Sequence, residues 1–368
     1  MLYKLRVANY KSIQDTTLSL EWDGKRKPKN YSAYDSLLFI EEGKRRAVPL
    51  VVIYGANSSG KSTLLSALAT LVSLIRNGVG SVKYTPDRLI SVDGTSFTTE
   101  IVSGDRLYSH SITYNESEIL SESLSEDGRV LFSIEKGILR EGKADESAFT
   151  SDGRQVYSSL SSSSSPFRDA IASRVGFFNP FAYSVSDAFE RYVTLSGKCR
   201  KECLEDVRSL SLKLDLSVED IKDGDVWQTE HTGCDSRGVW LSLEEESEGT
   251  KRLFALTSVI LAALSSGSIL VIDEIDVSLH SIVLRQMVSL FLDKRYNTTG
   301  AQLICSSHNT DLLDAPFVQK SEIAFFEKTK KRGSCVTRLS EIEGVKSLSA
   351  FRSDYLEGRF SGIPFSYI

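Results

Sequence analysis

No stretch of this sequence is apolar enough to cross a lipid bilayer. The longest apolar run, residues 253–264, falls short of the roughly 20 residues that a membrane-spanning helix needs. Residues 1–12 alternate apolar and polar side chains like a strand and lack the apolar centre of a signal peptide. The five cysteines are an odd number, which fits a reducing compartment better than a disulfide framework. We therefore expect a cytoplasmic protein that has no membrane contact.

An excess of positive charge is also absent. Lysine and arginine number 44 against 49 aspartate and glutamate residues, which gives a net charge of −5. The chain as a whole is therefore not a polyanion binder, and any contact with DNA would need a local basic patch. Three segments are candidates, although each is explained more simply as a solvated loop: residues 24–29, 44–46 and 328–332.

The organisation of the chain predicts an α/β fold. Its 368 residues, 41% of them hydrophobic, suffice for two or three structural units with a sizeable core. Internal repeats and sustained heptads are missing, which argues against a long coiled-coil arm between residues 70 and 240. Four parts are expected: strands and helices in residues 1–80, antiparallel hairpins in 81–145, an insert in 146–239 that is helical from about 167 to 216, and alternating helices and strands in 240–368.

The segment GANSSGKS, residues 55–62, follows a continuous apolar strand at residues 48–54 and precedes a predicted helix. It matches the GxxxxGK[ST] phosphate-loop pattern in the context that the pattern requires. The glycines let backbone N–H groups surround an anion, and the helix adds the positive end of its dipole. Lys61 would bind the β- and γ-phosphates of ATP, and Ser62 would ligate Mg²⁺. The alternative is a glycine- and serine-rich turn that caps a helix.

A second apolar strand, residues 268–273, ends in two adjacent carboxylates. Asp273 would hold Mg²⁺, usually through water, and Glu274 would polarise the water that attacks the γ-phosphate. One carboxylate suffices for a metal, so the second predicts hydrolysis rather than nucleotide binding alone. A solvated acidic turn is the alternative.

A third apolar strand, residues 301–306, is followed by His308. Three apolar strands thus carry polar residues at their carboxyl ends, and ligands of open α/β sheets bind at that edge. We therefore predict that His308 hydrogen-bonds the γ-phosphate. His280 would line the same cleft or a subunit contact, and the sequence leaves both open.

The stretch EEESEGTKRLFALTSVILAAL, residues 244–264, combines an acidic entrance with a helical pattern of apolar residues. Ser247 or Thr250 could simply cap this helix. Alternatively, the turn is half of a catalytic site whose other half lies elsewhere in the chain or in another chain.

Together these motifs resemble the ATPase heads of the ABC superfamily, with their Walker A and Walker B motifs. The resemblance is greatest to the soluble branch of chromosome-maintenance, recombination-repair and phage-defence ATPases. Within that branch, four segments are similar to the abortive-infection AAA ATPases of the RloA type: NYKS at 9–12, ESEGTKR at 246–252, DEIDVSLH at 273–280 and YLEGRFSGIP at 355–364. The implied fold is an ABC-type P-loop nucleotide-binding head with an antiparallel β subdomain and an inserted helical subdomain.

The resemblance implies a head-to-tail homodimer, or a higher homo-oligomer, with ATP and Mg²⁺ held between two chains. The phosphate loop of one chain would face the signature turn, residues 247–250, of the other. Asp276 would lie in the loop that crosses the dimer contact. Catalysis is assigned to Glu274 and His308, and metal ligation to Ser62 and Asp273. The implied nucleotide-binding residues are Asn57, Gly60, Lys61, Ser62, Thr63, Ser247, Gly249 and, by analogy with repair ATPases, Lys11.

Two departures from the family pattern argue against a transporter subunit. The signature turn is SEGT rather than the SGGQ of transporters, and no glutamine occurs between Ser62 and Gln155. The residue that completes the Mg²⁺ shell is therefore unidentified, with Gln155 as one candidate.

A second metal site is conceivable in the insert. Cys199 and Cys203, together with His231 and Cys234, have the spacing of a tetrahedral zinc site. The alternative is a set of unrelated thiols.

Three functions compete for the whole chain. The first is an ATPase that acts as a sensor or switch for a separate nuclease or toxin effector in phage defence. The others are a DNA-binding repair or recombination ATPase and a slowly hydrolysing, ATP-gated assembly scaffold. Because only 60 residues follow His308, we expect no appended nuclease domain and a partner that performs any cleavage.

Overall fold

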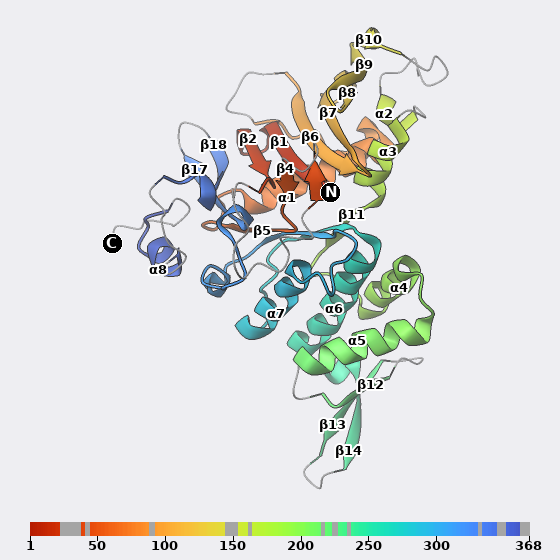
Figure 1. Cartoon of the computed structure of the whole chain (residues 1–368), viewed down its shortest axis with the longest axis vertical. Coiled ribbons are helices and arrows are strands. Elements are labelled where there is room, and N and C mark those ends of the chain that lie inside the picture. The colour runs from red at the N-terminus through yellow and green to blue at the C-terminus, as the bar shows by residue number, and fades with distance from the viewer. Residues whose placement is uncertain are drawn as a thin grey trace.

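One sheet of thirteen strands runs through the part of the chain that the structure describes (Figure 1). The strand order is β10-β9-β8-β7-β6-β1-β2-β18-β17-β5-β16-β15-β11. The computed structural model describes residues 1–22, 38–40, 45–87, 93–143, 154–160, 164–214, 218–222, 227–233, 237–329, 333–343 and 351–360.

Five parallel strands form one half of this sheet, in the order β17-β5-β16-β15-β11. Every residue of β5, β15 and β16 is buried, as expected for apolar strands covered on both faces. Their bounds are Leu50–Tyr54 for β5, Val175–Phe178 for β11, Ile269–Ile272 for β15, Gln302–Ser306 for β16 and Ile323–Thr329 for β17.

Antiparallel strands continue the sheet from β17. In β6, buried and half-buried residues alternate, as they do in a strand with one face on a core. The bounds are Leu2–Tyr10 for β1, Ile13–Ser19 for β2, Thr95–Ser103 for β6, Arg106–Tyr114 for β7, Ile119–Glu126 for β8, Arg129–Glu135 for β9, Ile138–Gly142 for β10 and Gly333–Arg338 for β18.

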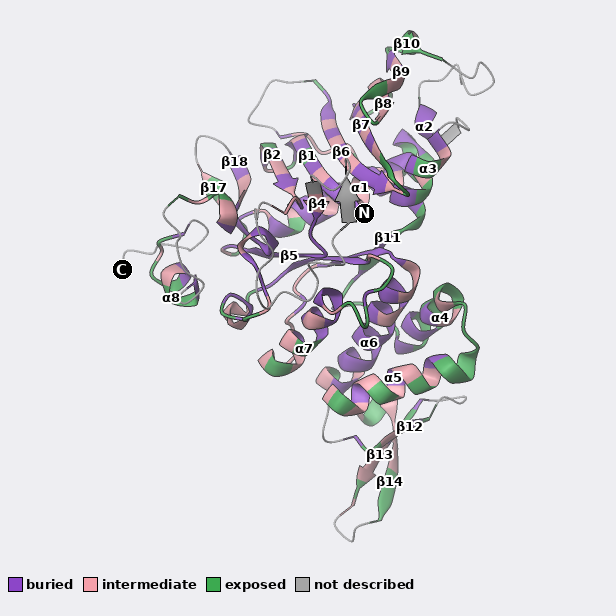
Figure 2. Cartoon of the chain, viewed as in Figure 1, coloured by how far each residue is buried: buried purple, intermediate pink, exposed green. Residues whose placement is uncertain are grey.

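Helices cover the two faces of the parallel strands (Figure 1). Alternate residues of β5 enter different cores: Val51 and Ile53 pack with α1 (Lys61–Asn77), whereas Val52 and Tyr54 pack with α6 (Glu248–Ser266) and α7 (Ser281–Leu292). Two further helices lie outside α6, namely α4 (Val185–Ser196) and α5 (Arg200–Leu214). Figure 2 shows the buried parallel strands between the two layers.

Smaller elements complete the description. A three-stranded sheet extends beyond α5 in Figure 1 and is formed by β12 (Asp220–Lys222), β13 (Gln228–Thr232) and β14 (Gly238–Ser242). The others are β3 (Leu38–Ile40), β4 (Arg45–Ala47), α2 (Tyr157–Leu160), α3 (Ser165–Arg168) and α8 (Phe351–Leu356).

The structure confirms the predicted α/β fold and its antiparallel hairpins. Of the segment expected to be helical from about residue 167 to 216, residues 185–196 and 200–214 are helices, whereas Val175–Phe178 forms the edge strand β11 and residues 215 and 216 lie outside the described residues. Pairing with β15 overrides any local helical preference of these four residues. Within the described residues, no helix combines the length and the apolar composition that a bilayer crossing requires.

Candidate active site

The phosphate loop, residues 55–62, connects β5 to α1 and packs against β17 and β18. Gly60 has a φ of 119°, and a Cβ placed there would lie 2.7 Å from the Phe326 ring and from the Ser334 hydroxyl. A Cβ on Gly55 would collide with the Phe326 carbonyl. Both positions therefore need glycine for a positive φ and for a close approach of the neighbouring strands.

Lys61 folds back onto this loop. Its ammonium donates to the carbonyls of Gly55 at 2.7 Å and Ala56 at 3.1 Å. Burial lowers the pKa of Lys61, and the carboxylates of the acidic turn, residues 273–276, oppose that shift. Because these carboxylates attract the ammonium, the phosphate loop and the acidic turn interact electrostatically.

The loop is suited to a phosphate group. No side chain caps the start of α1, so its first N–H groups keep their anion-binding capacity. The Ser59 hydroxyl is buried and has no hydrogen-bond partner within the described residues. In the loop and the first turn of α1, Asn57 and Ser62 are exposed, whereas Thr63 is half-buried. A polyphosphate would satisfy these donors.

The acidic turn is held by Ser306 at the end of β16. The Ser306 hydroxyl donates to Asp273 and accepts from the backbone N–H of Glu274 at 2.7 Å. Glu274 has a φ of 51°, an uncommon conformation for a residue with a side chain and one that concentrates at functional sites. No hydrogen bond reaches the half-buried Glu274 carboxylate from any described residue. The carboxylate is therefore available to a ligand.

His308 follows β16, which lies between the phosphate-loop strand β5 and the acidic strand β15. Its backbone N–H donates to Asp276 at 3.0 Å, while its side chain is exposed. The structure thus brings the carboxyl ends of β5, β15 and β16 to one edge, as the sequence predicted.

Asn179 is a polar residue at this edge that the sequence analysis missed. It directly follows β11. The β11–β15 register pairs Phe178 with Ile272, so the next residues of the two strands, Asn179 and Asp273, are neighbours. Its side-chain oxygen accepts from the N–H of Phe181 at 3.0 Å and keeps a second lone pair for a ligand, and the side chain is exposed. The signal was the short run VGFF before Asn-Pro, which marks a strand that ends in a turn.

Gln155, the alternative metal residue, does not lie at this edge. The carbonyl of the preceding Arg154 accepts from the Val79 N–H just beyond the end of α1. Seventeen helical residues, about 25 Å, separate that end from the phosphate loop. The prediction that Gln155 could complete the metal shell is therefore wrong.

The signature turn forms an exposed helix start. The Ser247 hydroxyl accepts from the Thr250 N–H at 3.1 Å, so Ser247 is indeed the N-cap of α6. The turn lines a groove of about 590 Å³ together with His280, the N-cap of α7. The hydrogen bonds of Ser247 stay within this turn, and those of the Lys61 ammonium stay within the phosphate loop.

Two of the three acids before Ser247 have structural partners. Glu245 caps the short helical turn that begins after Ser242. Glu246 accepts from the side chains of Thr229 and His231 on β13, which ties the small sheet to the signature turn. Glu244 is exposed.

Lys11 lies beside α1 rather than at the start of the helix. Its ammonium donates to Ser66 at 2.8 Å, five residues and thus about 7.5 Å beyond Lys61 along the helix axis. Lys11 also lines a cavity of about 710 Å³ with Lys83, Tyr84 and Lys328. The other candidate basic residues, apart from Arg45 and Arg46, fall outside the described residues.

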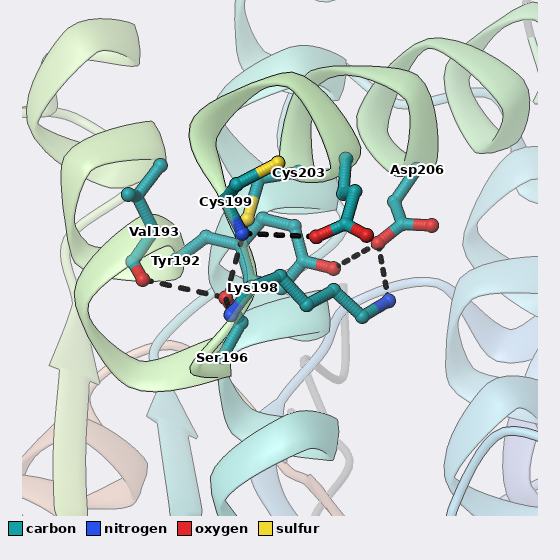
Figure 3. Close-up of polar contacts among 8 residues, drawn as sticks. Tyr192, Val193, Ser196, Lys198, Cys199, Cys203 and Asp206 are labelled. Atoms are coloured by element: carbon teal, nitrogen blue, oxygen red, sulfur yellow. Dashed lines mark hydrogen bonds and ion pairs between the residues drawn. The ribbon is translucent and has the colours of Figure 1, made fainter.

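The structure does not assemble the zinc site from the residues that it describes. Cys199 and Cys203 lie at the start of α5 (Figure 3), where the Cys199 N–H donates to Glu202 and the Cys203 thiol contacts Ser196 at 3.2 Å. His231 hydrogen-bonds Glu246 instead, and no group of three metal-ligating side chains occurs in the described ranges. Cys234 lies outside those ranges.

Comparison with known proteins gives one family match. A family model described as "AAA domain, putative AbiEii toxin, Type IV TA system" matches residues 50–314, which is most of the chain. No curated protein matches the sequence.

Solved structures are similar in fold at low identity. An SMC head bound to the C-winged helix domain of ScpA is 12% identical over 92% of this chain and 97% of that chain, with a TM-score of 0.53. The SMC head domain from Thermotoga maritima is 14% identical over 92% and 98%, with a TM-score of 0.46. The recombination mediator RecF is 11% identical over 92% and 98%, with a TM-score of 0.43. At these identities the likeness concerns the fold alone.

Proposed function

The chain belongs to the family of AAA domains described as a putative AbiEii toxin of a type IV toxin–antitoxin system, and on that premise we propose that it hydrolyses ATP as a head-to-tail dimer. Family and fold make it an ATPase of the ABC/AAA type. The observation that carries the proposal is the edge where the phosphate loop, the acidic turn and His308 meet.

Nucleotide binding uses the phosphate loop. On binding, the Lys61 ammonium exchanges its two loop carbonyls for the β- and γ-phosphates, and the N–H groups at the start of α1 receive the phosphate oxygens. Ser62 and Asp273 are oxygen ligands of the kind that Mg²⁺ prefers, and Asn179 would join them from the neighbouring strand. Mg²⁺ supplies charge neutralisation at the β- and γ-phosphates.

Proton removal falls to Glu274. Its N–H is fixed by Ser306, which leaves the carboxylate to accept a proton from the attacking water. His308, on the adjacent strand end, would donate to the γ-phosphate and stabilise the charge that develops there.

The signature turn completes the site from a second copy of the chain. A helix start with a serine hydroxyl and a Gly249 N–H is an anion-binding feature, and the hydrogen bonds of Ser247 and of Lys61 each stay within their own loop. In a head-to-tail dimer it would meet the γ-phosphate held by the other chain.

Dimerisation makes hydrolysis depend on protein concentration. We expect ATP turnover per chain to rise with concentration and then to saturate, whereas a self-sufficient monomer would have a constant rate. Glu274→Gln should lower the rate by about 10²–10⁴-fold while ATP binding persists. A constant rate per chain over a wide concentration range, with wild-type activity in Ser247→Ala, would refute the shared site.

The cellular role that we propose is a switch for a separate nuclease or toxin effector in phage defence; the family description, which names a type IV toxin–antitoxin system, supports a place in such a system. We place it in the cytoplasm, where the thiols of Cys199, Cys203, Cys305 and Cys335 would stay reduced. Affinity purification with ATP and with ADP should recover an effector in one state only. Recovery of no effector in either state would count against the switch.

A DNA-binding ATPase is the second candidate, favoured by the cavity that Lys11, Lys83 and Lys328 share. It predicts ATP-dependent DNA binding that weakens steeply with salt, because each neutralised phosphate releases counterions. Binding that is absent at low salt would eliminate this candidate.

A further inference from the structure

Among the described residues, Arg252 is the largest fully buried side chain that carries a charge. It lies in the second turn of α6 and is 2% exposed. Burying a guanidinium is costly unless its donors are used, and burial lowers the pKa of Arg252. The partners that it does have are therefore informative.

Those partners are backbone carbonyls of the acidic turn. One terminal nitrogen, Nη2, donates to the Glu274 carbonyl at 2.8 Å and approaches the Ile275 carbonyl at 3.4 Å. Its Nε is buried and has no partner among the described residues. Together with Ser306, which binds the Glu274 N–H, Arg252 fixes the backbone on both sides of the catalytic carboxylate.

The same helix start packs against the loop that follows the acidic turn. A Cβ on Gly249 would lie 3.0 Å from the Ser278 carbonyl, so the signature turn and this loop already touch. A displacement of α6 would thus be transmitted to Glu274 by the guanidinium and by this contact. Glu274 is sensitive to such a displacement because its φ of 51° is maintained by its surroundings.

We infer that Arg252 is a positioning residue that couples the signature turn to Glu274 of the same chain. The inference rests on the proposed dimer, in which these two elements serve different ATP molecules. When the turn binds the γ-phosphate of one ATP, Arg252 positions the Glu274 backbone. The Glu274 carboxylate can then activate the water that attacks the other ATP. The two ATP molecules are therefore hydrolysed cooperatively.

The test compares Arg252→Met and Arg252→Lys with the matched control Lys251→Met. Lys251 is the neighbouring cation on α6, and its ammonium pairs with the exposed Glu248 at 3.0 Å. For Arg252→Met we expect kcat to fall about 10–100-fold, since misplacement of a reacting group by about 1 Å has that effect. The Hill coefficient for ATP should fall to about 1, whereas ATP binding to the single chain should be unchanged.

Arg252→Lys should recover part of kcat, because an ammonium can still donate to the Glu274 carbonyl, and Lys251→Met should resemble the wild type. A folded Arg252→Met with wild-type kcat and Hill coefficient would overturn the inference. If Arg252→Met fails to fold, the Arg252→Lys variant is the test. Unchanged kcat and unchanged cooperativity in Arg252→Lys would overturn the inference. A wild type without concentration-dependent hydrolysis would instead refute the dimer.

Discussion

Ser306 is predicted to support both the stability of the acidic turn and the chemistry of the site. Its side chain is fully buried and makes two hydrogen bonds, one to the Asp273 carboxylate and one from the Glu274 N–H. Ser306→Ala removes the hydroxyl without adding volume. It leaves one buried donor without an acceptor and one carboxylate without a donor.

The expected loss follows from these two bonds. An unsatisfied buried N–H costs about 1–3 kcal/mol, and a hydrogen bond to a charged group contributes about 1.5–3 kcal/mol. Because water can reach the half-buried Asp273, we expect a net destabilisation of about 2–3 kcal/mol. Since the Glu274 N–H loses its acceptor, kcat should also fall by about 10-fold or more.

Ser307→Ala is the matched control. Ser307 is the adjacent buried serine, and its hydroxyl accepts only the Asn309 N–H at 3.0 Å in the described part of the chain. It should lose about 1 kcal/mol and retain kcat. Denaturant unfolding and steady-state ATPase rates measure both effects. If Ser306→Ala and Ser307→Ala had equal kcat values, Ser306 would not position Glu274.

Three further changes probe other parts of the site. Gly60→Ala should abolish ATP binding, measured by titration with a fluorescent ATP analogue, because the added Cβ meets Phe326 and Ser334; tight binding would show that the loop tolerates a side chain. Asn179→Ala should raise the Mg²⁺ concentration needed for half-maximal hydrolysis, and an unchanged Mg²⁺ curve would remove Asn179 from the metal shell. Glu246→Ala should raise hydrogen exchange in β13 by freeing Thr229 and His231, and unaltered exchange would contradict that tie.

Three of the parallel strands, β5, β15 and β16, were predictable because they are largely apolar and all of their residues are buried. The runs at β5, β15 and β16 are continuous, and the polar residues after them mark the ligand edge. The helix cap at Ser247 and the bonds of Lys61 to the Gly55 and Ala56 carbonyls lie within a few residues, which local sequence specifies.

The other features depend on partners that are distant in sequence. The four-residue β11 exists through its pairing with β15, so Asn179 was missed inside a region expected to be helical. Arg252 meets Glu274 across 22 residues, and Glu246 meets Thr229 across 17, through packing that no periodicity encodes. Lys11 was expected near the phosphates, yet its ammonium is held at Ser66.

The mass in solution of the Glu274→Gln variant, measured in the presence of ATP, tests the shared site most directly. This variant should bind ATP without cleaving it, so light scattering should give twice the 40.8 kDa chain mass with ATP and the chain mass with ADP. Adding Gly249→Asp should keep ATP binding and return the chain mass, because the new carboxylate repels the γ-phosphate at the signature turn. If the double variant still dimerised with ATP, the signature turn would be a helix cap alone and the central claim would fail.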